Sequence, residues 1–152
     1  MTKRVIVFLV LNFAALVLGR LVTNEGVPSE WFMSLNKAPW SPPGWVFGGA
    51  WTTIMICFAF YMAHLWSVIT DRKLLISLFV IQWILNVGWN PVFFHFHFVL
   101  LGLVVITALT VLIGYFQVAF LRDLGRRSIL ILPYLIWMLI ATSLNGYIYF
   151  NN

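Results

Sequence analysis

Long apolar runs separated by short polar connections make up most of the chain. Five of these runs approach or exceed the ~20 apolar residues that a helix needs to cross a bilayer. They cover residues 5–22, 45–66, 74–94, 98–121 and 129–150. No ten-residue stretch alternates in polarity as a barrel strand does, and lipid offers no partner for open backbone groups. The pattern predicts an all-α membrane protein, one domain over residues 1–152, built as a bundle of five transmembrane helices with a long structured first loop.

The first connection, from Thr23 to Ser41, is much longer than the others. Within it, Pro28-Ser29-Glu30 precedes the run WFMSL, which predicts a short helix lying across the mouth of the bundle. A long ordered loop in a small protein is usually functional and often acts as a lid. We therefore expect this loop to cover a site.

Tryptophans are concentrated around this loop, where the stretch from Trp31 to Trp51 holds four of the chain's eight. Ser41, followed by Pro42 and Pro43, predicts an N-cap, so that the second long helix begins near Pro42 and carries Trp45 and Trp51 inward. Indoles at the loop also fit a membrane-interface belt, and for Trp31 and Trp40 that interpretation is about as good as a binding role.

Composition and charge agree with a membrane protein, since 62% of residues are apolar and 9% are charged. The net charge of +5 does not indicate nucleic acid, because the basic residues lie in short clusters between apolar runs. Two of them, Arg20 and Lys37, lie on one side of the predicted bundle. The other side holds seven, namely Lys3, Arg4, Arg72, Lys73, Arg122, Arg126 and Arg127. In the cytoplasmic membrane of a bacterium this bias predicts an N-terminus inside and a C-terminus outside.

The third predicted helix carries an unusual polar stripe. Gln82, Asn86 and Asn90 follow one another at intervals of four residues, with Trp89 beside them. Amides facing lipid are costly, so the stripe should face the bundle interior. Bonding between helices and contact with a ligand explain it equally well. Pro91 then predicts the end of the regular helix.

Two helices carry small residues at helical spacing, which permits close helix approach. They are Asn12, Ala15 and Gly19 in the first helix and Gly44, Gly48 and Thr52 in the second. For the second seam we expect packing within the bundle in preference to a dimer contact.

Several chemistries are disfavoured by what the spans contain. They hold no Asp, Glu or Lys that could serve as an ionisable relay, which counts against a proton-coupled transporter. No glycine-rich phosphate loop or Ser/His/Asp constellation is readable, and the single Cys57 excludes an intramolecular disulfide. His95 and His97 fit interfacial histidines better than metal ligands, so no metal site is predicted.

Aromatic and amide side chains from separate spans are placed to meet. Trp51, Asn86, Trp89, Trp137 and Ala141 can all point into one cavity. An apolar, aromatic-lined cleft with a few amides is how small-molecule sites are usually built. Such a cleft suits a large, flat, hydrophobic ligand, and tetrapyrroles and sterols both fit this description.

Three motif blocks in order resemble the tryptophan-rich sensory protein or translocator protein (TspO/MBR) family. The blocks are Trp40-Ser41-Pro42-Pro43-Gly44-Trp45, then Asn86…Trp89…Pro91, then Pro133-Tyr134-Leu135-Ile136-Trp137 with Ala141 and Asn145. The resemblance covers the whole chain. It implies a five-helix membrane protein, commonly a homodimer, that binds porphyrins, sterols and drug-like molecules in a cavity closed by the first loop.

The resemblance also implies a function and a set of site residues. We expect a receptor or sensor for porphyrin-like ligands, protoporphyrin or haem, with a role in tetrapyrrole regulation or transport and no required cofactor. The expected ligand-binding residues are Trp31, Phe32, Trp51, Asn86, Trp89, Asn90, Trp137 and Ala141. The alternative is an enzyme that promotes light- and oxygen-dependent degradation of bound protoporphyrin, with Trp51 and Trp137 as catalytic candidates.

The chain departs from the family pattern at three places. Phe32 stands where the family has a tyrosine, and Lys37-Ala38-Pro39 moves the usual proline by one position. No basic residue follows Tyr147, so the weak cholesterol-recognition pattern is absent and a sterol is the less favoured ligand.

Overall fold

The computed structural model describes residues 1–22 and 28–152, and this part of the chain contains helices and connections but no strand. Five helices in it are long and apolar enough to cross a membrane. They are α1 (Thr2–Val22), α3 (Gly44–Val68), α4 (Arg72–Asn90), α5 (Val99–Ala119) and α7 (Leu132–Asn151). The predicted all-α bundle of five spanning helices is therefore confirmed.

Short segments complete the fold. The predicted helix in the first loop is present as α2 (Glu30–Ser34), and a π-helical turn, Pro91–His95, follows α4. Between α5 and α7 lie α6 (Leu121–Leu124) and a 3₁₀ segment, Gly125–Ile131. The part of the predicted first loop that falls on residues 23–27 lies outside the described residues.

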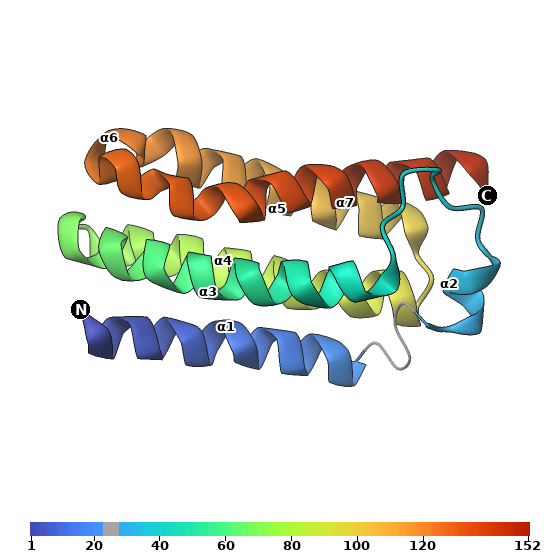
Figure 1. Cartoon of the computed structure of the whole chain (residues 1–152), viewed down its shortest axis with the longest axis horizontal. Coiled ribbons are helices and arrows are strands. Elements are labelled where there is room, and N and C mark those ends of the chain that lie inside the picture. The colour runs from blue at the N-terminus through green and yellow to red at the C-terminus, as the bar shows by residue number, and fades with distance from the viewer. Residues whose placement is uncertain (23–27) are drawn as a thin grey trace.

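The long helices run side by side (Figure 1), with α1 packed against α3 and α4, and α5 packed against α4 and α7. The N-terminus, the α3–α4 connection and α6 lie at one end of the bundle, whereas α2 and the C-terminus lie at the other. The seven clustered basic residues are thus gathered at the first end, and the covering loop is at the second.

Aromatic rings fill the centre of the bundle. Phe58 of α3 is fully buried and meets Tyr134 of α7 edge-on, with ring centroids 5.4 Å apart. Phe116 of α5 lies 5.9 Å away, and its carbonyl accepts a hydrogen bond of 2.8 Å from the Tyr61 hydroxyl. Edge-on contacts between aromatic rings thus join α3, α5 and α7 in the core.

Small residues let α1 approach its neighbours, as predicted. Asn12, Ala15 and Gly19 are all buried, and Asn12 donates from Nδ2 to the Met55 carbonyl of α3 at 3.0 Å. A Cβ on Gly19 would lie 2.8 Å from Nδ2 of Asn90 on α4, so any side chain at this position would require the Asn90 amide to shift.

The polar stripe of α4 faces inward, as predicted. Gln82 and Asn86 are buried, and Asn90 is half-buried against Gly19. Gln82 donates from Nε2 to the Tyr134 hydroxyl at 2.7 Å, which links α4 to α7 across the core.

The predicted start of the second long helix is wrong by two residues. The helix begins at Gly44 rather than Pro42, and its N-cap is Pro43 rather than Ser41, with no side-chain capping bond. The cause is local, because a proline disfavours helical conformation in the residue before it, so Pro43 keeps Pro42 out of the helix. Pro43 itself is extended, with φ −57° and ψ 150°.

Two expectations for the outer face of α3 are also wrong. Trp45 is 78% exposed instead of pointing inward, although Trp51 is half-buried. Gly48 and Thr52 are exposed, and a Cβ on Gly48 would meet nothing within 4 Å, so this part of the seam does not pack within the bundle. Sequence spacing places these residues on one face, but only the docking of α3 decides where that face points.

The link between Gln82 and Tyr134 predicts a non-additive pair of substitutions. Tyr134→Phe should lower the free energy of unfolding by about 1–2 kcal/mol, since it leaves a buried amide donor unpaired. Adding Gln82→Leu should restore much of that loss, because both polar partners are then gone. Reversible unfolding in mixed micelles measures both, and Tyr115→Phe, at an exposed position of α5, is the control. A double variant less stable than Tyr134→Phe alone would contradict this account.

Candidate ligand-binding site

The short helix α2 forms a cover at the C-terminal end of the bundle. Ser29 caps it, with Oγ accepting from the backbone N–H of Phe32 at 3.3 Å. Phe32 points at Phe94, with ring centroids 5.4 Å apart, and Trp31 meets Phe93 edge-on at 5.4 Å. The cover is therefore attached to the bundle through aromatic contacts.

Polar contacts hold the rest of the covering segment. Asn36 and Asn152 bond reciprocally: the Asn36 N–H donates to Oδ1 of Asn152 at 2.7 Å, and Nδ2 of Asn152 donates to the Asn36 carbonyl at 3.1 Å. Nζ of Lys37 donates to the carbonyls of Phe32 and Met33, each at 3.3 Å, at the end of α2 where carbonyls lack helical partners. All of these contacts lie on the exposed or half-buried side, so each can break without disturbing the core.

The π-helical turn after α4 supplies the aromatic wall beneath the cover. Pro91 cannot donate the next helical hydrogen bond, and the wider turn that follows buries both Phe93 and Phe94. The Trp89 ring stacks on Phe93 at 5.4 Å with an interplanar angle of 10°. His97 follows with φ 57° and stacks on Trp31 at 4.0 Å.

A cavity of about 240 Å³ lies between the cover and these walls. Its lining combines aromatic and aliphatic side chains with a lysine, a serine and an asparagine. The lining residues are Phe32, Met33, Lys37, Ser41, Pro42, Gly44, Phe47, Trp89, Phe93, Phe94, Ala141, Leu144, Asn145 and Ile148. An apolar chamber with a few convergent polar groups is the usual form of a small-molecule site.

Two buried polar atoms in this lining have no hydrogen-bond partner within the described chain. They are the indole N–H of Trp89, a donor, and Oδ1 of Asn145, an acceptor. An unpaired buried polar group costs about 1–3 kcal/mol, so native structures rarely leave one without a reason. Both residues line the cavity, but neither unpaired atom is exposed to it, and Oδ1 of Asn145 lies toward α5, where a Cβ on Gly102 would be 3.4 Å away.

The structure brings three of the predicted binding residues to the cavity, namely Phe32, Trp89 and Ala141. Trp31 lies beside it, between Phe93 and His97. Asn86 is buried in the bundle, and its carbonyl accepts a hydrogen bond of 3.2 Å from Nδ2 of Asn90. Trp31, Asn86 and Asn90 are therefore not among the residues that line the cavity.

The two remaining tryptophans lie between α3 and α7. Trp51 meets Tyr134 edge-on at 6.1 Å, and Trp137 meets Phe47 at 5.3 Å. Trp137 also borders a shallow groove of about 310 Å³ with Trp45 on the outer side of the two helices. Phe47 thus contacts both Trp137 and the cavity, whereas Trp137 does not line the cavity.

Sequence reasoning left several lining residues out of the site. Asn145 shares a helical face with Ala141, four residues earlier, and this spacing is the signal that could have included it. Phe93 and Phe94 follow Pro91, but consecutive aromatic residues give no indication of which one is buried. Phe47 had no local signal, because its position depends on how α3 docks.

The fold and the cavity define a multi-pass integral membrane protein with a covered chamber at one end. The TspO/MBR family matches residues 7–150. Tryptophan-rich protein TspO of Chlorobaculum tepidum is 35% identical over 78% of this chain and 77% of its own length. Tryptophan-rich protein TspO of Archaeoglobus fulgidus is 33% identical over 88% of this chain and 87% of its own, and the human translocator protein is 29% identical over 88% and 80%. The chain belongs to the TspO/MBR family.

The reciprocal asparagine pair predicts how the cover is held. Asn152→Ala should raise the local hydrogen-exchange rate of the Asn36 amide about tenfold, since two hydrogen bonds contribute on the order of 1–2 kcal/mol. Asn151→Ala is the matched control, because Nδ2 of Asn151 bonds to the Tyr147 carbonyl of its own helix. Equal exchange rates in the two variants would show that the pair does not hold the cover.

Proposed function

We propose that this protein is a membrane receptor or sensor that binds a porphyrin-type tetrapyrrole in the cavity beneath α2. The observation that carries the proposal is the aromatic chamber beneath α2, whose lining adds the polar residues Lys37, Trp89 and Asn145. A porphyrin is flat and apolar, with pyrrole N–H groups as donors and carboxylates as acceptors. Relatives named tryptophan-rich sensory protein and translocator protein support a role in sensing or translocation. We propose that this role concerns tetrapyrroles.

Lys37 adds a charge suited to this ligand. Its Nζ borders the cavity and lies 5.1 Å from the Phe32 ring centroid. The two carbonyls it contacts in the closed state are weak partners compared with a carboxylate, which forms a charge-assisted bond. A porphyrin carboxylate can therefore replace them.

The size of the cavity requires the cover to move. At about 240 Å³ it is smaller than the ~300–1,000 Å³ of drug-sized pockets, and a tetrapyrrole is a large ligand. Outward movement of α2 breaks the aromatic contacts of Trp31 and Phe32, and movement of the segment after it breaks the Asn36–Asn152 pair and the bond from Trp40 Nε1 to Ser143 Oγ. Binding is thus coupled to opening of the cover, which gives a sensor two distinguishable states.

The alternative, photo-oxidative degradation of bound protoporphyrin, has less geometric support. Its candidate residues, Trp51 and Trp137, are not among the residues that line the cavity. A ligand held in this cavity would therefore not contact either indole directly.

Substitution inside the cavity tests the proposed function. Ala141→Phe fills the chamber and should abolish saturable protoporphyrin binding, while Trp89→Phe makes one aromatic wall smaller and should weaken it about tenfold. The control for bulk is Ala108→Phe, at an exposed position of α5. Absorbance titration in detergent measures the affinities, and unchanged binding in Ala141→Phe would refute the assignment of the site.

We also propose a homodimer, oriented with its N-terminal end on the cytoplasmic side. The basic residues gathered at that end support the orientation.

Gly48 and Gly49 of α3 support the dimer contact, because they are exposed with open space above them and so permit close contact with a second helix. Gly48→Leu should reduce the mass measured by light scattering from twice 17.5 kDa to the monomer value. Gly114→Leu, in a similarly open place on α5, should leave the mass unchanged, and a dimeric Gly48→Leu would place the contact elsewhere.

A further inference from the structure

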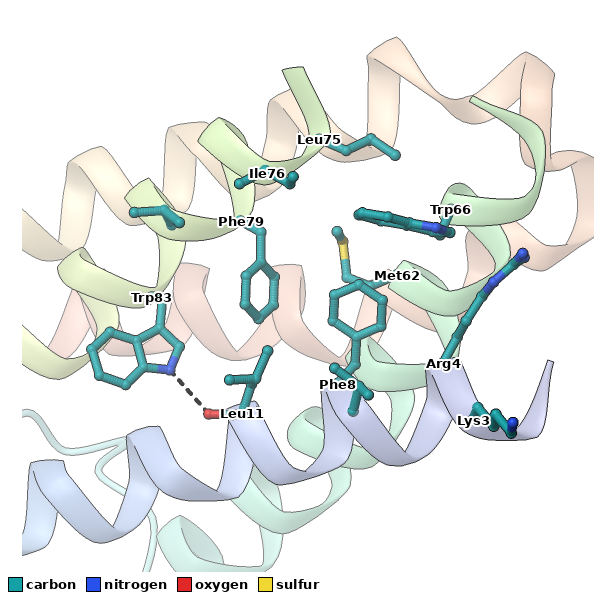
Figure 2. Close-up of a pocket in the computed structure, with 12 residues that line it drawn as sticks. Lys3, Arg4, Phe8, Leu11, Met62, Trp66, Leu75, Ile76, Phe79 and Trp83 are labelled. Carbon is teal, nitrogen blue, oxygen red and sulfur yellow. Dashed lines mark hydrogen bonds between the residues drawn. The ribbon is translucent and has the colours of Figure 1, made fainter. Parts of the chain in front are cut away.

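A larger hollow, of about 560 Å³, lies between α1, α3 and α4 at the opposite end from the ligand cavity (Figure 2). Its walls are almost wholly apolar, and none of its lining residues also lines the cavity beneath α2. The proposed function leaves it unexplained.

Aromatic side chains hold this groove in a fixed shape. Phe8 of α1 meets Phe79 of α4 edge-on at 5.2 Å and Trp66 of α3 at 6.3 Å. At the far end Trp83 donates from Nε1 to the Leu11 carbonyl at 2.9 Å, as the dashed line in Figure 2 marks. The groove is therefore preformed and needs no rearrangement to accept a chain.

The groove opens sideways toward the hydrocarbon. Its rim residues Val7, Ile76 and Val80 are 55%, 50% and 45% exposed, while Leu75 and Phe79 at its floor are buried. From Leu75 to Trp83, α4 rises about 12 Å at ~1.5 Å per residue. This length approaches the ~15 Å that one leaflet contributes to a hydrocarbon core of ~30 Å. The groove thus has the form and depth for one acyl chain of a lipid.

Positive charge stands at the membrane-surface end of the groove. Lys3 and Arg4 both line it there, as Figure 2 shows, and Nη1 of Arg4 donates to Oγ of Ser67 at 2.8 Å. The Ser67 contact orients the guanidinium toward the α3 side of the groove and leaves its other N–H groups for a further acceptor.

The neighbouring α3–α4 connection adds to this charge. The Arg72 guanidinium lies over the Trp66 ring, 4.7 Å from its centroid, and donates to the Trp66 carbonyl. Lys73 follows it in the sequence. The carboxylate of Asp71 is used as the cap of α4, with Oδ1 accepting from the Leu74 N–H at 3.0 Å. The mouth of the groove is therefore cationic.

From this complementarity we propose that the groove binds an anionic membrane phospholipid. The phosphate lies against Lys3 and Arg4, and one acyl chain follows the groove past Phe8 and Phe79 toward Trp83. Basic pockets between transmembrane helices are an established way to select anionic headgroups, since each cation near the surface strengthens binding. The site is independent of the tetrapyrrole site, and its failure would leave that proposal untouched.

Lipid retention in native mass spectrometry tests the proposal on the whole protein in detergent. Phosphatidylglycerol should bind about tenfold or more tightly than phosphatidylcholine with the same chains. Lys3→Ala/Arg4→Ala should abolish that preference. Arg126→Ala/Arg127→Ala removes the same charge at the same end of the bundle and should keep it. Equal affinity of the unchanged protein for the two lipids would overturn the proposal of a specific headgroup site. So would an equal loss of the preference for phosphatidylglycerol in both double variants.

A block of the groove tests the acyl-chain part. Val80→Trp should reduce phosphatidylglycerol binding about tenfold, and Ile76→Trp provides a second block if the first variant fails to fold. Ile84→Trp, one turn further along α4 and 58% exposed, should bind like the unchanged protein. Unaltered binding in both block variants would overturn the proposal. If Val80→Trp converted the protein from dimer to monomer and still bound phosphatidylglycerol, the groove would be occupied by a second copy of the chain, and the lipid proposal would be wrong.

Discussion

The requirement that buried backbone groups find partners within the protein shapes the whole molecule. In hydrocarbon this requirement permits helices or closed barrels, and in this protein five helices are long and apolar enough to span the membrane. Regular helices place side chains at a fixed period, so neighbouring residues in sequence cannot converge on one spot. The backbone leaves α geometry near the ends, and at one end the loop around α2 and the π-helical turn Pro91–His95 together enclose the cavity.

The two hollows differ in the chemistry of their walls because they lie in different surroundings. The cavity beneath α2 combines aromatic walls with the polar residues Lys37, Trp89 and Asn145. The groove beside α1 is open to lipid and carries its charge only at the surface end. The fully buried ring of Phe58, midway along α3, belongs to the core that fills the bundle between them.

Much of the candidate site followed from periodicity, but its exact membership did not. Asn86 and Asn90 share a face of α4 in sequence, yet Asn90 lies against Gly19 of α1, because α1 packs on that end of the stripe. Trp137 and Ala141 share a face of α7, yet only Ala141 lines the cavity, and Trp137 packs against Phe47 of α3. Each long helix packs against more than one other helix. The helical period places residues on a common face, but it does not tell which neighbouring helix each of them contacts.

Hydrophobicity and backbone chemistry within a few residues were enough to predict the five spans, the inward polar stripe of α4, the short helix α2 and the end of α4 at Pro91. The packed bundle was needed to show that Gly48 faces outward, that Asn36 bonds to Asn152, and that Trp89 and Asn145 line one cavity. These outcomes depend on contacts between residues far apart in the chain, whose geometry is fixed only when the helices dock.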